Sequence, residues 1–126
     1  MLKFDKSKTQ ELKDFLYNSY IHDAGLEIIR YECGENRLKV ETFNPIFNVK
    51  INLTFHDVRT VFAIRGNDSG SSETIVSLTA EEDFSYLHNC FPKHCKSIQD
   101  SIYLLFQTFS GDEFHIVSRE VFIEVY

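Results

Sequence analysis

The stretch VKINLTFH, residues 49–56, alternates strictly between apolar and polar side chains. Successive side chains of a β-strand point to opposite faces of a sheet, so this stretch predicts a strand with one buried face. Val49, Ile51, Leu53 and Phe55 lie on the apolar side, and His56 falls on the polar side. Such a half-buried strand is typical of an antiparallel sheet that packs on a core along one face only.

The residues before this strand follow the same two-residue period. Leu26–Cys33 and Arg37–Phe43 flank Gly34-Glu35-Asn36, a short turn that suits a hairpin. Asn44-Pro45 marks the next turn, between the hairpin and the stretch at 49–56. The sequence therefore predicts three consecutive strands joined by tight turns.

The N-terminal segment has a helical period instead. Ser7 and Gln10 fit a capping box, in which each side chain bonds the backbone at the other residue. Leu12, Phe15 and Leu16 then recur at spacings of three and four residues, which predicts an amphipathic helix that ends before Gly25.

Further strands are expected after residue 56. The segment 66–73 contains no apolar residue and predicts a hairpin loop, since a strand rather than a helix follows it. A short helix is expected at 80–88, with acidic residues in its first turn. The expected strands are Val58–Arg65, Thr74–Leu78, Ser101–Phe109, Glu113–Ser118 and Glu120–Tyr126.

These elements fit one domain spanning residues 1–126 of a mainly antiparallel β fold (α+β). About eight strands with short connections would form a curled sheet or a sandwich, and the N-terminal helix would cover one face or end. The pattern fits a two-sheet sandwich and a barrel-like sheet equally well. With 43% hydrophobic residues, including twelve Phe and six Tyr, the chain can fill a real core.

The sequence predicts a cytoplasmic protein. Its first residues are charged and lack the apolar segment of a secretory signal, and no apolar run is long enough to span a membrane. Cys33, Cys90 and Cys95 form an odd set, so free thiols are expected.

Charge is unevenly distributed. Residues 1–65 carry ten Lys/Arg and nine Asp/Glu, whereas residues 66–126 carry three and ten, a net charge of −7. This acidic half disfavours nucleic acid as a partner and suits a basic protein. The exposed aromatic rings of Phe84 or Tyr86 could anchor such a partner. The acidic candidates for partner binding are Glu81, Glu82, Asp83, Asp112 and Glu113.

Two sets of residues could carry metal chemistry. His88, Cys90, His94 and Cys95 supply the right atoms for zinc, but eight consecutive residues are poorly spaced for a tetrahedral site. A small metal-dependent enzyme using these residues, or His22, His56 and His115, is the alternative function. The leading expectation has no catalytic residue, no metal and no cofactor.

The dipeptides His22-Asp23 and His56-Asp57 fit a structural role better than catalysis. Aspartate favours turns because its carboxylate can accept from nearby backbone N–H groups. His22 is expected to tie the helix to the sheet at the junction between them. Asp57 is expected to end one strand and begin the link to the next.

The fragment from Ile21 to Tyr31, with Leu38-Lys39-Val40 and Ile51–Val58, resembles a loose group of small bacterial β-rich proteins of unknown function. Some members of this group are thought to be immunity proteins of polymorphic toxins. The resemblance covers about the first half of the chain and assigns no catalytic residue. It implies a bacterial cytoplasmic protein and, more weakly, neutralisation of a toxin.

The leading hypothesis is a non-enzymatic protein-binding module. One form of it is an immunity-type protein that neutralises a basic partner. A small-ligand carrier that uses the Phe-rich interior is a further alternative. The terminal strand Glu120–Tyr126 is expected at a sheet edge, where it could pair with its twin in a homodimer.

Overall fold

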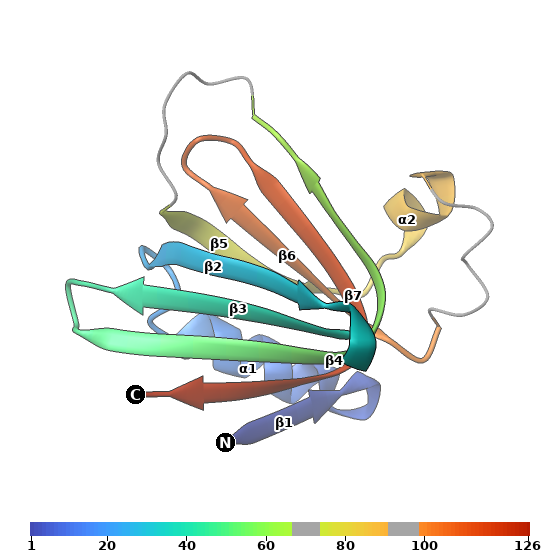
Figure 1. Ribbon diagram of the computed structural model, residues 1–126, viewed down its shortest axis with the longest axis horizontal. Coiled ribbons are helices and arrows are strands. Elements are labelled where there is room, and N and C mark those ends of the chain that lie inside the picture. Colours follow the sequence, from blue (N-terminus) through green and yellow to red (C-terminus); the bar gives the residue numbers. More distant parts are fainter. Residues whose placement is uncertain (67–73, 91–98) are drawn as a thin grey trace.

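The computed structural model describes residues 1–66, 74–90 and 99–126, except for the side chains of His88 and Cys90. Within these ranges seven strands form one antiparallel sheet, accompanied by two α-helices and two 3₁₀ turns (Figure 1). The mainly antiparallel β fold with an N-terminal helix is therefore confirmed. The strands are β1 (Leu2–Asp5), β2 (Gly25–Glu32), β3 (Arg37–Asn44), β4 (Val49–Ile64), β5 (Ile75–Glu81), β6 (Ile102–Thr108) and β7 (Glu113–Val125). The helices are α1 (Thr9–Asn18) and α2 (Ser85–Cys90), and the 3₁₀ turns are η1 (Lys6–Lys8) and η2 (Cys33–Glu35).

The centre of the sheet is the pair β4–β7. The strand order is β2-β3-β4-β7-β6-β5. The short strand β1 also pairs with β7, along a different part of it from β6. β4 lies along β7 from Ile51 opposite Val125 to Ile64 opposite Glu113. On its other side β7 pairs first with β6 and then with β1. The prediction that Glu120–Tyr126 is an edge strand is therefore wrong, because this segment has a neighbour on each side.

β4 and β7 are each longer than predicted. The expected strands Val49–His56 and Val58–Arg65 form one strand with a bulge between Val58 and Thr60, and Glu113–Val125 is likewise continuous. Asp57 has a φ of 53°, a left-handed conformation that bends the strand without ending it. The bend divides the sheet into a lower half of β1, β2, β3 and the paired ends of β4 and β7, and an upper half of β5, β6 and their other ends. The short strand β1 was not predicted.

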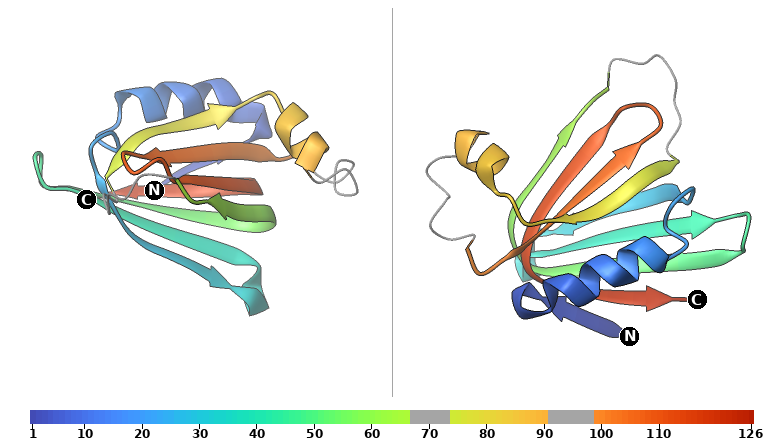
Figure 2. Two further views of the ribbon diagram at one scale, coloured as in Figure 1. Left: turned by 90° about the horizontal axis from the view of Figure 1, so that it is seen from above. Right: turned by 180° about the vertical axis from the view of Figure 1, so that it is seen from behind.

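The sheet curls until its two outer strands meet at one corner (Figure 2). Gly25 at the start of β2 bridges Thr74 just before β5. Two backbone hydrogen bonds support the bridge, from Asp23 N to Ile75 O at 2.9 Å and from Ile75 N to Ala24 O at 2.8 Å. The fold is thus a single curled sheet, the barrel-like alternative, rather than two separate sheets.

Helix α1 packs against β5 and β1 and buries Leu12 and Leu16 in the main core. Its start differs from the predicted capping box. Asp5 caps η1 by accepting from the backbone N–H of Ser7 at 3.0 Å, and α1 itself has no side-chain cap. The apolar stripe was enough to predict the helix, whereas its first turn depends on β1, which was not predicted. None of the described helices has the length and apolar content needed to cross a membrane.

The main core fills the concave side of the sheet. Alternate residues of β3 and β4 face it, so Leu38, Val40, Leu53 and Phe55 are almost completely buried. The alternation of residues 49–56 is confirmed, with His56 half-buried on the outer face. A second, smaller apolar cluster lies on the outer face of the upper half.

Candidate functional site

The outer face of the upper half is covered by α2 and the segment that leads to it. Buried Leu87, Tyr103 and Val117 form its centre, and Phe62, Phe84 and Leu105 pack around them. This covering is why the run Ile102–Phe106 is apolar throughout, since β6 is buried on both faces here. The segment before α2 turns at Asp83, whose carboxylate accepts from Ser85 N at 2.9 Å.

His115 on β7 is the polar residue at the centre of this cluster. Its side chain is only 3% exposed, and its ring lies flat on Phe62, with ring centres 4.3 Å apart. Tyr86 of α2 covers it from another direction at 5.4 Å. Cross-strand pairing aligns Phe62, His115 and Leu105 in one row across β4, β7 and β6. The contacts with these two aromatic rings hold the buried imidazole in a fixed orientation.

Both ring nitrogens of His115 have partners. Nε2 lies 2.9 Å from Glu113 Oε1, and Nδ1 lies 2.5 Å from the Tyr103 hydroxyl. An ionised carboxylate only accepts, so Nε2 must carry the proton that bonds Glu113. In the neutral imidazole Nδ1 is then the acceptor, and the Tyr103 hydroxyl donates to it. The chain of hydrogen bonds runs from a buried phenol through the imidazole to a half-exposed carboxylate.

A hollow of about 270 Å³ opens over this chain; we call it the outer hollow. It brings together three of the five predicted acidic residues, although they come from β5, β7 and the link before α2. Tyr86, 44% exposed, forms an aromatic side of the hollow. The lining residues are Glu81, Asp83, Tyr86, Tyr103, Leu105, Glu113 and His115.

The other two predicted acidic residues have structural partners. Glu82 pairs with Lys13 of α1 at 3.1 Å. Asp112, in the β6–β7 turn, accepts from Gly66 N at 2.7 Å and lies 3.3 Å from Arg65 Nε. The backbone of Gly66 runs so close to that turn that an added Cβ would lie 2.3 Å from Ser110 O. Asp112 therefore holds the ends of β4 and β7 together.

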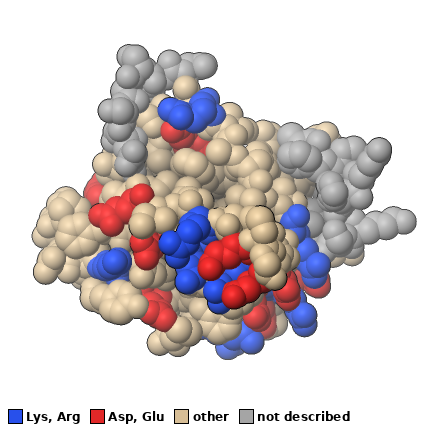
Figure 3. Space-filling model, viewed as in Figure 1, with Lys and Arg blue, Asp and Glu red and all other residues tan. Residues whose placement is uncertain are grey.

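The outer face of the lower half is different. Lys, Arg, Asp and Glu are interspersed over the face seen in Figure 1, with no extended patch of one sign (Figure 3). A hollow of about 200 Å³ there has both cationic and acidic walls. Its charged residues are Arg30, Lys39, Glu41 and Glu124.

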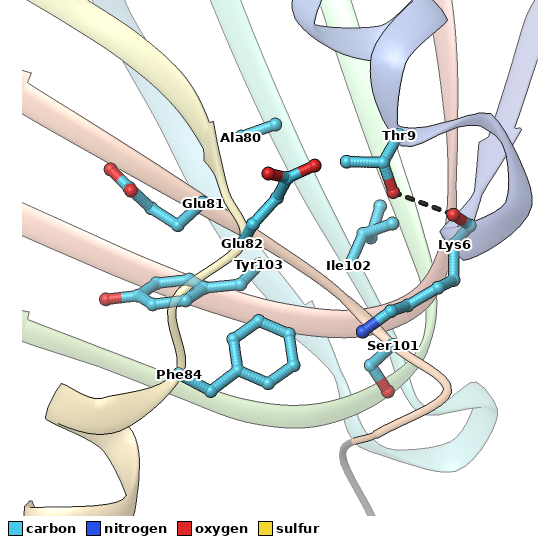
Figure 4. Close-up of a pocket in the computed structure, with 9 residues that line it drawn as sticks. All are labelled: Lys6, Thr9, Ala80, Glu81, Glu82, Phe84, Ser101, Ile102 and Tyr103. Atoms are coloured by element: carbon cyan, nitrogen blue, oxygen red, sulfur yellow. Dashed lines mark hydrogen bonds between the residues drawn. The ribbon is translucent and has the colours of Figure 1, made fainter.

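A third hollow, of about 300 Å³, separates α1 from the β5–α2 link (Figure 4). Lys6 extends from η1 toward Phe84, with its Nζ 4.7 Å from the ring centre. The Lys13–Glu82 pair joins the same two parts of the chain. These contacts attach the N-terminal segment to the wall of the outer hollow, since the two hollows share Glu81 and Tyr103.

The two His-Asp dipeptides lie at turns and bends, as predicted. The aspartates change the chain direction through their backbone conformation rather than through carboxylate hydrogen bonds. Asp23 and Asp57 both adopt left-handed backbone conformations, with φ of 69° and 53°. The side chain of His22 is exposed and pairs with Asp23. The link from this junction to the sheet is the buried side chain of Asn44, which donates to Tyr20 O at 2.9 Å and to His22 O at 3.3 Å. His22 is therefore held by its backbone, and the prediction that its side chain ties helix to sheet is wrong.

The three histidines proposed for a metal enzyme do not meet. His22 lies before β2, His56 packs on Phe122 in the lower half, and His115 is buried in the upper half. Among the described residues no three His, Cys, Asp or Glu side chains could hold a metal ion together. Cys33 is an exposed free thiol. The side chains of His88, Cys90, His94 and Cys95 lie outside the described residues.

Sequence reasoning missed Phe62, Tyr103 and Leu105, the apolar walls around His115. A signal was present, because the five consecutive apolar residues Ile102–Phe106 indicate a strand covered on both faces. Which element covers the second face is not encoded in that run.

Searches of family models, curated proteins and solved structures give no match to the chain.

Proposed function

We propose that this protein is a non-enzymatic binding module whose outer hollow receives a cationic side chain of a basic protein partner. The observation that supports this is the convergence of Glu81, Asp83 and Glu113 on one hollow beside Tyr86. Carboxylates pair with lysine or arginine, and an aromatic face adds a cation–π contact. Three acids from distant parts of the sequence give this hollow a concentrated negative charge.

The hollow is built in advance of binding. The Tyr103–His115–Glu113 chain fixes one wall, and Asp83 is fixed by its cap on α2. Side chains already held in place lose little conformational freedom when a partner binds. The net charge of −7 over residues 66–126 would steer a basic partner toward the half of the chain that supplies the hollow.

The toxin-immunity role implied by the resemblance is one specific form of this proposal, with a basic toxin as the partner. The metal-enzyme alternative through His22, His56 and His115 loses its basis, since these side chains have separate surroundings. The small-ligand carrier stays a prediction.

A peptide titration tests the proposal. The probe is a short peptide in which arginine and lysine alternate with glycine, added to ¹⁵N-labelled protein while amide and imidazole resonances are recorded. We expect saturable shifts centred on Tyr86, Leu105 and His115, weakening steeply with added salt. A peptide with glutamate in place of the basic residues should produce no saturable shift.

Two matched double variants distinguish binding at the outer hollow from nonspecific attraction to an acidic protein. The double variant E81Q/D83N removes two charges, while the asparagine side chain that replaces Asp83 can still cap α2. We expect it to bind the basic peptide about tenfold more weakly. The control E11Q/E27Q removes two exposed charges elsewhere and should change affinity less than about twofold. Equal losses in both variants, or shifts spread evenly over the surface, would refute the proposal.

A further inference from the structure

The strand β2 forms an outer edge of the sheet. In the described part of the chain it pairs with β3 on one side, and on the other side only Gly25 bridges Thr74. For the rest of that side, from Leu26 to Glu32, no described strand pairs with the backbone donors and acceptors. Ile28 and Tyr31 are 41% and 43% exposed, and Ile29 is exposed as well. A long strand edge flanked by apolar side chains is a template for pairing with another strand.

Two other edge strands of the sheet are protected. β1 is only four residues long, and α1 packs along β5. Short edge strands and covering helices are two common ways to prevent edge pairing. β2 has eight residues, no Pro and no Lys, and its one irregularity is a bulge at its beginning, between Leu26 and Ile28. These devices leave open the edge of β2 and, in the described residues, the side of β4 after His56 that faces away from β7. Charged Arg59 and Arg65 flank that second edge, whereas exposed isoleucines lie at the centre of the β2 edge.

The charge around β2 suits a second copy of the chain. The hairpin of β2 and β3, residues 25–44, contains three Lys/Arg and four Asp/Glu, close to balance. Neither a strongly basic nor a strongly acidic partner would be favoured there. Two copies joined through this edge would keep the strongly acidic half of each chain out of the contact.

A two-fold axis normal to the sheet restricts the register, because one residue must then lie opposite itself. Centring the pair on Arg30 would place two guanidinium groups face to face, which is unfavourable. Centring it on Ile29 pairs the regular part of the strand around Ile28–Arg30, which lies after the bulge between Leu26 and Ile28. Arg30 then lies opposite Ile28 of the second copy on the outer face, and no like charges are directly opposed.

We infer that the protein forms a homodimer through antiparallel pairing of β2 with β2 of a second copy, centred on Ile29, which joins the two sheets into one. This inference is independent of the outer hollow, which lies on the other half of the sheet. It also replaces the edge that the sequence predicted, Glu120–Tyr126, which is occupied within the chain.

Sedimentation equilibrium tests the inference over about 5 to 500 µM protein at physiological salt. The wild type should show a mass that rises with concentration toward that of a dimer. I28K places a lysine opposite Arg30 of the second copy at two symmetric positions, and it should weaken association about tenfold or more. I28E removes the same apolar side chain and meets Arg30 of the second copy, although it also lies opposite Glu41 of β3 within its own chain, so its affinity should fall clearly less than that of I28K. Both substitutions lie on the outer face, and circular dichroism checks that each variant is folded.

The controls are Y17K and Y17E, at a position on α1 that is 90% exposed. Both should associate as the wild type does. A wild type that remains monomeric at the highest concentration would overturn the inference. So would a dimer that I28K and I28E weaken equally, because the register requires a dependence on the sign of the charge.

Discussion

His56 on β4 and His115 on β7 both lie on the outer face of the same strand pair, and each contacts a phenylalanine ring. His56 meets the ring of Phe122 edge-on at 4.8 Å and is half-exposed in the lower half. His115 lies flat on Phe62 and is buried in the upper half. One sheet face thus provides a half-exposed histidine and a buried histidine that is fixed by hydrogen bonds.

The difference comes from what covers the sheet rather than from the strands. α2 and its leading segment pack over the upper half and supply Tyr86 and Leu87. No described element covers the outer face around His56. A covered polar residue must find partners or destabilise the fold, and His115 has two. The covering segment therefore creates both the fixed histidine and the hollow beside it.

The largest expected effect is at the two histidines themselves. H115A should lower the free energy of unfolding by about 2–4 kcal/mol, because it leaves a cavity and removes the hydrogen bond between the imidazole and the Tyr103 hydroxyl. H56A should cost less than about 1 kcal/mol, since this side chain makes one edge contact and stays partly in water. Urea denaturation of the two variants measures both values. Similar losses would show that α2 does not bury His115 as the structure has it.

A second comparison concerns the junction before β2. N44A should cost about 2–3 kcal/mol, because the buried amide bonds two carbonyls at the junction and accepts from Ile46 N and Phe47 N. H22A removes an exposed side chain and should change stability by less than about 0.5 kcal/mol. The measurement is again the free energy of unfolding in urea. If H22A cost as much as N44A, the His22 side chain would tie helix to sheet after all.

Local patterns predicted the elements well, because they reflect which face of each element is buried. The alternation at 49–56 and the stripe of Leu12 and Leu16 both appear in the observed burial. They failed where one residue changes the path of the chain. Asp57 looks like a strand terminator in sequence, yet in a left-handed conformation it bends a strand that continues to Ile64.

The site was predictable in part. Glu81, Asp83 and Glu113 were selected for charge alone, and the fold brings them together. That they surround a buried histidine depends on α2 folding back over β6 and β7, a long-range contact with no local signal. His115 was predicted as one of three metal ligands because composition shows the residue type and not its neighbours.

A smaller effect is expected at the carboxylates beside the two histidines. E113Q keeps a hydrogen-bond acceptor for His115 Nε2 but loses its charge, and should cost about 1 kcal/mol. Glu120 lies opposite His56 and pairs with Lys3 at 3.3 Å on the surface, so E120Q should cost less than about 0.5 kcal/mol. Thermal unfolding at neutral pH compares them. A larger loss for E120Q would reverse the proposed contrast between the covered and open halves.

The smallest expected effect is a difference in unfolding free energy between variants of two Asp-x-Ser caps. These caps are Asp5 before η1 and Asp83 before α2. The pKa of Asp5 lies below its ordinary value of 3.8, chiefly because the Ser7 hydroxyl donates to its carboxylate, with desolvation acting in the opposite direction. A folded-state pKa below the unfolded one means that ionised Asp5 stabilises the fold above the unfolded pKa. That contribution is lost as the pH falls below about 4 and through the folded pKa.

D5N keeps the cap and removes the charge, so wild type and D5N should differ by a few tenths of a kcal/mol at pH 7 and converge at about pH 2. The measurement is urea unfolding of both proteins across this range. A difference that grew as the pH fell would have the wrong sign for a lowered pKa, and would mean that the Ser7 contact does not favour ionised Asp5. The cap at Asp83 borders the outer hollow, whose nearby carboxylates repel its charge, so D83N should be milder than D5N at pH 7. This last contrast links local capping to the clustering of charge that the proposed function requires.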